Sequence, residues 1–255
     1  MSEEINDQQM LRYSRQIMLD DIDIAGQQTL MAATVLVVGA GGLGCPVAMY
    51  LASAGVGKLI IADDDQVELS NLQRQIGHGE QDLRKLKVAS LEETLRDINP
   101  EVQIETIHRR LQGDSLSATV AKVDMVVDAS DNFKTRFALN AACVVEQKPL
   151  ISGAAIRMEG QVTAFDPRLE HSPCYRCLYS EQEHEDSSCS SNGVLAPLVG
   201  IIGSLQAFEA IKLLVGFGES LVGRLLIFDG KYLEWRELKI SRDPKCPICG
   251  DFNGA

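Results

Sequence analysis

The sequence predicts an α/β fold with a doubly wound sheet, parallel in its N-terminal part and antiparallel at its C-terminal end. Three observations support this fold class. Strand-like apolar runs alternate with helix-like segments as far as Gly153, and a glycine-rich turn joins the first strand to the helix after it. Beyond Gly153 the alternation is lost, and GQVTAF is typical of an antiparallel strand. We therefore expect a Rossmann-like sheet with a ligand site at the carboxyl ends of its strands.

The individual elements follow from local pattern. Two short helices (10–19 and 25–33) precede the first strand, which begins at Val35 and leads through the glycine turn into a helix ending near residue 54. Asn99 and Pro100 end a later helix. The other strands expected in the parallel half are 58–63, 102–107, 123–130 and 148–154, and the other helices are 85–98, 114–121 and 132–146.

The C-terminal part is predicted as an antiparallel strand (160–165), an acidic, serine-rich surface loop (179–192), a long helix (196–215) and two strands (224–229 and 233–240). The chain shows no internal repeat and no linker. We therefore expect residues 1–255 to form a single domain.

Charge and composition exclude several classes of partner. The net charge of -12 argues against nucleic acid or an anionic membrane. The apolar stretch 195–217 carries Gln206, Glu209 and Lys212, which favours a buried helix over a membrane span. MSEEINDQQM has no apolar core of a signal peptide, so we expect a cytoplasmic, reducing location in which cysteines are thiols or metal ligands.

The turn GAGGLG (39–44) fits a phosphate-binding pattern, because backbone amides and a helix N-terminus follow a strand. A tight turn without a ligand is the alternative. Asp63 ends the second strand, where a ribose-binding acid is expected. At this point an NAD site and an ATP site remain equally open.

The next residues favour a triphosphate. Asp63, Asp64 and Asp65 are followed by SNLQRQ (70–75), in which Arg74 offers a planar fork to phosphate, while Lys87 adds a point charge. Asn71 and Gln73 supply neutral donors. A solvated loop is the alternative, and it suits Asp64 and Glu68 better than the string of amides and arginine.

Six stretches resemble one known family: RYSRQI (12–17), GAGGLG (39–44), SNLQRQ (70–75), DASDN (128–132), SGAAIRMEGQ (152–161) and CYRC (174–177). Together they closely resemble the MoeB/ThiF adenylyltransferases, which are bacterial relatives of ubiquitin-activating enzymes. The resemblance extends over residues 10–250.

This resemblance implies an enzyme that uses MgATP to adenylate the C-terminal glycine of a ubiquitin-like sulfur-carrier protein, with release of pyrophosphate, before a thiocarboxylate is formed. SGAAIRMEGQ favours the small subunit of molybdopterin synthase, in molybdenum cofactor biosynthesis, as the carrier. LRYSRQIMLDDI and IADDDQVELSNLQRQI resemble ThiF as much, which keeps the thiazole (thiamine) carrier as an alternative. The implied partners also include a cysteine desulfurase or rhodanese-type sulfur donor and a second copy of the chain.

The resemblance also implies roles for residues. Gly42 would belong to the phosphate loop, Asp63 would bind the ribose, Asp131 would hold Mg²⁺, and Arg15 would reach into the neighbouring subunit's site. The candidate nucleotide-binding residues are Gly42, Asp63, Asp65, Ser70, Asn71, Leu72, Gln73, Arg74, Lys87, Asp131 and Asn132. The candidate catalytic residues are Arg15, Arg74, Lys87, Asp131 and Cys189.

Two CxxC pairs, Cys174/Cys177 and Cys246/Cys249, predict a tetrahedral Cys₄ zinc knuckle rather than two redox dithiols. The family resemblance implies that this zinc is structural. Cys189 stands apart in the acidic loop. Two interpretations of it remain open: an incidental exposed thiol, or a nucleophile that meets the activated carrier or a persulfide donor. Cys45 and Cys143 are expected to be packing residues. The four histidines form no spaced cluster, so we expect them on the surface or in loops.

Two other functional classes compete with this interpretation. An NAD-dependent oxidoreductase needs a hydride-transfer residue and a substrate domain, and the sequence offers neither. A non-catalytic scaffold of the same fold would be expected to lack Arg74, Lys87 or Asp131, all of which are present.

Overall fold

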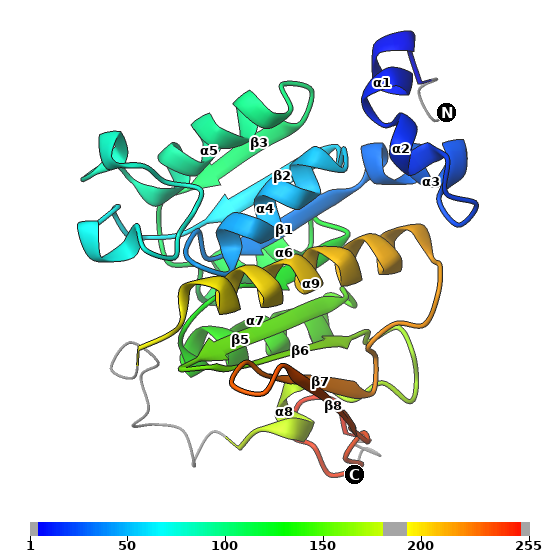
Figure 1. Ribbon diagram of the computed structural model, residues 1–255. Coiled ribbons are helices and arrows are strands. Elements are labelled where there is room, and N and C mark those ends of the chain that lie inside the picture. The colour runs from blue at the N-terminus through cyan, green and yellow to red at the C-terminus, as the bar shows by residue number, and fades with distance from the viewer. Residues whose placement is uncertain (1–4, 181–192, 251–255) are drawn as a thin grey trace.

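The computed structural model describes residues 5–180 and 193–250, which are built around one large sheet (Figure 1). Its strands are β1 (Thr34–Val38), β2 (Lys58–Ala62), β3 (Gln103–Ile107), β4 (Met125–Asp128), β5 (Leu150–Ile156), β6 (Glu159–Phe165), β7 (Arg224–Asp229) and β8 (Glu234–Lys239). They lie side by side in the order β3-β2-β1-β4-β5-β6-β7-β8.

The direction of the strands divides the sheet as the sequence predicts. The pairs from β3 across to β5 are parallel, and those from β5 across to β8 are antiparallel. From β1 the chain first builds outward through β2 and β3, and then returns to place β4 on the other side of β1. This reversal is a topological switch point, where the loops after β1 and β4 diverge and leave room for a ligand.

Helices cover both faces of the sheet. One face carries α3 (Asp23–Ala32), α4 (Gly44–Ser53), α5 (Lys87–Ile98) and α9 (Ala196–Val215), and the other carries α6 (Gly113–Val120) and α7 (Phe133–Val145) (Figure 1). Strand β1 shows why, because Val35 and Val37 join the first apolar core while Leu36 and Val38 join the second. The Rossmann-like fold class is therefore confirmed.

Helix α9 has the bounds that the sequence predicts. Pro197 lies in its first turn, and Gly216 ends it with a left-handed φ of 86°. By length and composition α9 could cross a membrane, but it packs on α4 and on β4, β5 and β6. Its buried Glu209 forms an ion pair with Lys212 at 2.8 Å, which compensates the buried charge.

The N-terminal helix differs from the prediction. In place of one helix over 10–19 the chain forms α1 (Asp7–Arg12) and α2 (Ser14–Ile17), separated at Tyr13. Tyr13 is buried, and its hydroxyl accepts a hydrogen bond of 2.9 Å from Asn99 Nδ2. The helix is interrupted at this residue, where φ is -97° and ψ is 8°, and apolar spacing alone reveals neither the break nor the long-range contact. A short helix, α8 (Tyr175–Leu178), was also not predicted, because four residues show no periodicity.

Candidate functional site

The glycine turn follows β1 at the switch point. Gly39 has φ +104°, and a Cβ there would lie 2.6 Å from the carbonyl oxygen of Ala129 in the loop after β4. A Cβ on Gly44 would overlap the carbonyl oxygen of Gly39. Both positions therefore require glycine, and α4 can start directly behind the turn with its N-terminus facing the carboxyl ends of β1 and β4. We call this side of the sheet the switch edge.

Asp63, at the end of β2, holds the glycine turn in place. Its Oδ2 accepts a hydrogen bond of 2.7 Å from the Ala40 amide, and its Oδ1 accepts one of 2.8 Å from the Asp65 amide. Burial raises the pKa of Asp63 above its ordinary value, while the Ala40 amide and then Lys87 oppose that rise. The predicted ribose-binding acid thus also fixes the conformation of the loop.

Lys87 is the first residue of α5 and is brought to the same place. Its Nζ lies 2.8 Å from Asp65 Oδ2, and its side chain is 7% exposed. The Lys87 amide also donates to the Asp65 carbonyl at 3.0 Å. A cation that is almost buried, with one exposed carboxylate as partner, is well placed to exchange that partner for an anionic ligand.

The loop after β2 carries the predicted SNLQRQ residues along the switch edge. Arg74 Nη1 donates to the carbonyl oxygen of Ser70 at 3.1 Å, and Asn71 Oδ1 accepts from the Glu68 amide at 3.3 Å. Ser70 and Gln73 are exposed, whereas Asn71, Leu72 and Arg74 are half-buried. The structure thus places this group beside the glycine turn but leaves most of it accessible.

Gln75 and His78 join this loop to the glycine turn, and sequence reasoning missed both. Gln75 is buried next to Gly41, where a Cβ would lie 3.3 Å from Gln75 Nε2. His78 was expected on the surface or in a loop; it lies in a loop, where it is buried and bonded to the Ala40 carbonyl and to Ser90. The sequence did not reveal its burial, because the partners of His78 lie far away in sequence. His108 and His171 are exposed, as expected.

Asp131 and Asn132 follow β4, on the other side of the switch point. Asn132 is the N-cap of α7, with its Oδ1 accepting from the Thr135 amide at 3.0 Å. Asp131 is exposed next to it, and its Oδ1 accepts from Asn132 Nδ2 at 3.4 Å. An exposed carboxylate at the start of a helix, on the same edge as the glycine turn, suits a ligand of a hard cation.

Asp128, the last residue of β4, stabilises this loop from the interior of the protein. It is fully buried, with Ser130 Oγ donating to its Oδ1 at 2.6 Å and Arg136 Nε lying 3.9 Å from its Oδ2. Arg136 also donates to the Ser130 carbonyl at 2.9 Å. Burial raises the pKa of Asp128, and the Arg136 cation opposes that rise.

Arg15 does not join these residues within the chain. It is exposed on α2, whose Gln16 Nε2 donates to the Ala54 carbonyl at the C-terminal end of α4. The glycine turn lies at the N-terminal end of α4, a helix about 15 Å long. Figure 1 shows α2 at the opposite end of α4 from the loops that follow β2.

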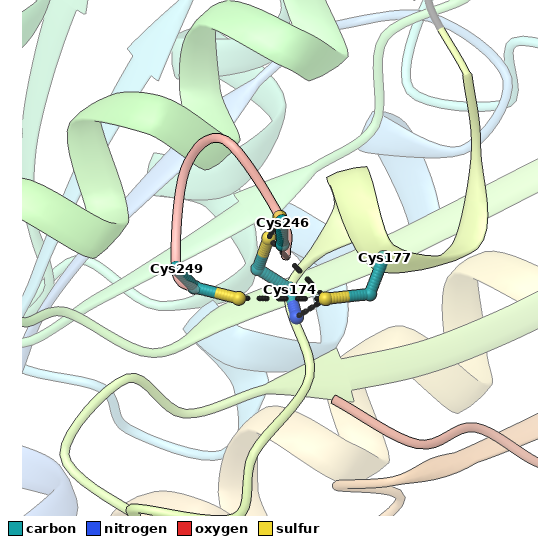
Figure 2. Close-up of side chains that lie close together, drawn as sticks. All are labelled: Cys174, Cys177, Cys246 and Cys249. Carbon is teal, nitrogen blue, oxygen red and sulfur yellow. Dashed lines mark hydrogen bonds between the residues drawn. The ribbon is translucent and has the colours of Figure 1, made fainter. Parts of the chain in front are cut away.

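The four cysteines of the CxxC pairs form one cluster, as Figure 2 shows. The sulfur of Cys174 lies 3.6 Å from that of Cys246 and 4.0 Å from that of Cys177, and the sulfurs of Cys177 and Cys249 are 3.4 Å apart. All four are free thiols. Sulfurs at about 2.3 Å from a tetrahedral zinc would be about 3.8 Å apart, so the spacing fits zinc.

An apolar surface completes the switch edge, at the two hairpin turns that join β5 to β6 and β7 to β8. Met158, Tyr232, Leu233 and Trp235 are each at least 43% exposed, and we call them the apolar edge patch. The Gly230 amide donates to the Met158 carbonyl at 2.7 Å, which ties the two turns together. Leu233 has φ +58°, a conformation that glycine or asparagine adopts at lower cost.

Cys189 and most of the acidic loop, residues 181–192, lie outside the described residues. The prediction for Cys189 stays a prediction.

Comparison with known proteins adds the evolutionary context. A model of the ThiF family matches residues 13–248. The sulfur carrier protein ThiS adenylyltransferase of Escherichia coli is 47% identical over 249 residues, which are 98% of each chain. The molybdopterin-synthase adenylyltransferase of Salmonella typhimurium is 48% identical over 247 residues, 97% of this chain and 99% of the relative.

A solved structure agrees on the fold. The crystal structure of Escherichia coli MccB with ATP superposes with a TM-score of 0.83 at 24% identity, covering 98% of this chain and 77% of that one. Likeness at this level of identity shows the fold, and the Rossmann-like sheet is therefore shared with MccB.

Proposed function

Since this chain belongs to the ThiF family and its full-length relatives are adenylyltransferases, we propose that it adenylates a ubiquitin-like sulfur-carrier protein. The reacting group is the carboxylate of the carrier's C-terminal glycine, and the second substrate is ATP with Mg²⁺. The carrier is the small subunit of molybdopterin synthase, and the thiazole carrier is the alternative. The relatives of both branches are about equally similar to this chain, and adenylation of a sulfur carrier is common to both alternatives.

The proposed chemistry needs positioning and neutralisation of charge. An oxygen of the carrier's carboxylate attacks the α-phosphorus, the new oxygen–phosphorus bond forms, and the bond to the β-phosphate breaks with release of pyrophosphate. The carboxylate is already ionised at neutral pH, so a general base is not needed. The barrier arises from bringing anions together, and Arg74 and Lys87 lower it by binding the phosphates.

The arrangement of the switch edge is the single observation that carries this proposal. The glycine turn with its helix N-terminus, the nearly buried Lys87, and the exposed Asp131 all lie where β1, β2 and β4 end. Asp131, with Asn132 beside it, would hold Mg²⁺, which would supply further neutralisation of the phosphates. NAD chemistry has no use for this combination of cations and carboxylates.

The apolar edge patch supports a protein as the second substrate. It lies at the same edge as the glycine turn, so a carrier docked there could direct its C-terminal tail toward ATP. Leu233 keeps a large apolar side chain exposed in a strained conformation, a cost that a binding role accounts for. Within residues 5–180 and 193–250, β8 is an edge strand of the sheet, and an extended segment could add to it.

We further propose a homodimer in which Arg15 completes the site of the other subunit. Arg15 lies at the far end of α4 from its own glycine turn and is exposed. Tyr50 on α4 and Phe208 on α9 are 55% and 59% exposed on helices that pack against each other. A second copy of the chain would bury this apolar surface.

The remaining parts of the proposal concern metal and sulfur. A structural zinc held by Cys174, Cys177, Cys246 and Cys249 would tie the C-terminal tail to α8. Sulfur would come from a cysteine desulfurase or rhodanese-type donor in the cytoplasm. Any contribution of Cys189 would come in that later step, because adenylation requires only a carboxylate and ATP.

The test is ATP–pyrophosphate exchange with each purified carrier and with truncated carriers that lack the C-terminal glycine. We expect exchange with one full-length carrier and none with its truncated form. Exchange with neither carrier, in protein that binds MgATP, would reject the proposed substrate. Hydride transfer to NAD in place of exchange would reject the reaction itself.

A further inference from the structure

The imidazole of His78 lies behind the glycine turn and joins three segments of the chain. Its Nε2 is 2.9 Å from the carbonyl oxygen of Ala40, and its Nδ1 is 2.8 Å from Ser90 Oγ on α5. The sulfur of Cys45, in the first turn of α4, lies 3.7 Å from Nε2. His78 is 8% exposed, so these contacts account for most of its polar surroundings.

The partners determine which nitrogen carries the proton. A carbonyl oxygen can only accept, so Nε2 must be the donor to Ala40, and in the neutral ring Nδ1 then accepts from the Ser90 hydroxyl. Burial lowers the pKa of His78 and so favours this neutral form. The ring therefore has a defined orientation.

The hydrogen bond from His78 to the Ala40 carbonyl also determines the direction of the next backbone amide, that of Gly41. A trans peptide is planar, so its C=O and the following N–H point in opposite directions. Because His78 holds the Ala40 carbonyl inward, the Gly41 amide must point outward from the turn. Asp63 fixes the preceding peptide in the same way through the Ala40 amide. Among residues 5–180 and 193–250 the Gly41 amide has no hydrogen-bond acceptor, so it is available to an anion.

The contact with Ser90 connects this turn to the cation. Ser90 lies about one turn after Lys87 on α5, so the position of Ser90 determines that of Lys87. The His78 imidazole therefore fixes the position of the Gly41 amide relative to the ammonium group of Lys87.

We propose that His78 is a positioning residue that aims the Gly41 amide and sets it against Lys87 for binding the phosphates of ATP. His78 itself touches no substrate. The inference rests on the proposed function only in taking ATP as the ligand, and it concerns a residue to which the proposed mechanism assigns no part.

Two substitutions separate the two hydrogen bonds of the ring. In His78→Gln the amide nitrogen can reach the place of Nε2 and donate to Ala40, whereas in His78→Asn the shorter amide can reach only the place of Nδ1 beside Ser90. We expect His78→Gln to bind MgATP within about threefold of the wild type, and His78→Asn to bind about ten- to a hundredfold more weakly. Binding is measured by calorimetry without any carrier, so an error in the choice of carrier does not affect the result.

Steady-state kinetics add a second measurement, the KM for ATP compared with the KM for the carrier, which a general loss of stability would not change selectively. In pyrophosphate exchange the KM for ATP should rise in His78→Asn while the KM for the carrier stays near that of the wild type. Ser90→Ala, which leaves the imidazole in place but removes its anchor on α5, should raise the KM for ATP by about three- to tenfold. The Ser90→Ala variant also keeps the inference testable if His78→Asn fails to fold.

Thermal unfolding of each variant serves as the control. ATP affinity in folded His78→Asn equal to that of the wild type would overturn the inference. Equal weakening in His78→Gln and His78→Asn would also overturn it, because the donor to Ala40 would then not matter. Absence of exchange in the wild type, with the expected order of ATP affinities, would reject the proposed carrier and leave the role of His78 supported.

Discussion

Asp128 and Asp131 are three residues apart, yet the structure assigns them opposite environments. Asp128 is fully buried with Arg136 and Ser130, whereas Asp131 is exposed at the N-terminus of α7. Burial and partners, more than residue type, therefore distinguish a carboxylate that supports the loop from one that can meet a ligand.

This contrast predicts that replacing Asp131 lowers activity, whereas replacing Asp128 lowers stability. Asp131→Ala should lose at least about a hundredfold in pyrophosphate exchange while its melting temperature stays close to that of the wild type, because an exposed side chain contributes little to stability. Asp128→Ala should lower the free energy of unfolding by about 3 kcal/mol or more, since Arg136 is left buried without its carboxylate. Exchange at wild-type rate in Asp131→Ala would show that its assigned role is wrong.

His78 predicts a dependence of stability on pH. Burial, and then Lys87, lower its pKa from the ordinary 6.5, whereas the hydrogen bond to Ala40, and then Asp82 and Asp63, act in the opposite direction. Below pH 6.5 the unfolded chain therefore takes up a proton that the folded chain resists, and stability falls as the pH drops, by at most about 1.4 kcal/mol per pH unit.

The measurement is the free energy of unfolding by denaturant between pH 7.5 and about 5.5. His78→Gln should flatten this part of the profile, and His108→Gln, on the exposed surface, should not. A His78→Gln profile with the slope of the wild type would show that other groups carry the dependence.

At the scale of elements, apolar period and end signals predicted the long, regular pieces. Helix α9 was placed correctly because Pro197 and Gly216 mark its ends and its apolar length leaves little choice. The N-terminal helix was predicted as one piece, because the spacing of apolar residues shows neither the break at Tyr13 nor the contact of Tyr13 with Asn99, which lies 86 residues away. His78 was missed for the same reason, since Ala40 is 38 residues away and a lone histidine shows no pattern.

The cysteine cluster was predictable because spacing itself is the signal, and α8 and the C-terminal tail bring the two pairs together. We expect purified protein to carry about one zinc per chain, and Cys246→Ser/Cys249→Ser to lose it together with thermal stability, while ATP affinity is retained. Metal analysis and calorimetry check this. Cys143→Ser is the control, because this buried thiol lies outside the cluster and should leave the zinc content unchanged. Full zinc content in the double variant would rule out this site.

The two hairpin turns of the apolar edge patch make a separate prediction. Leu233→Ser should raise the KM for the carrier by about tenfold or more and leave the KM for ATP unchanged, because the side chain is exposed and lies away from the glycine turn. Leu238→Ser removes the same apolar side chain at an exposed position inside β8, and it should have little effect on the KM for the carrier. Equal effects of the two changes would mean that the patch is not the docking surface.

In the whole molecule, the proposed sharing of sites between subunits depends on where two of the candidate residues lie. Arg15 and Lys87 lie at opposite ends of α4, on α2 and at the start of α5. In a homodimer with shared sites, a mixed dimer of Arg15→Ala and Lys87→Ala chains would contain one site with both residues intact.

Mixing the two inactive variants in equal amounts should therefore restore about a quarter of the wild-type exchange activity, because half of the dimers are mixed and each has one complete site. Each variant alone should stay inactive. If mixed dimers form, as tagged chains can demonstrate, and activity does not return, Arg15 does not act across the interface.

Transfer of AMP to the carrier's C-terminal glycine is the step on which the proposed function rests. Its most direct test is intact-mass measurement of each carrier after incubation with the enzyme and MgATP, with pyrophosphatase present to draw the reaction forward. We expect a carrier that is heavier by one adenylyl group, formed by the wild type and absent with Arg74→Ala or with a carrier lacking the terminal glycine. If the mass of both carriers stays unchanged with an enzyme that binds MgATP, the chain does not adenylate these carriers.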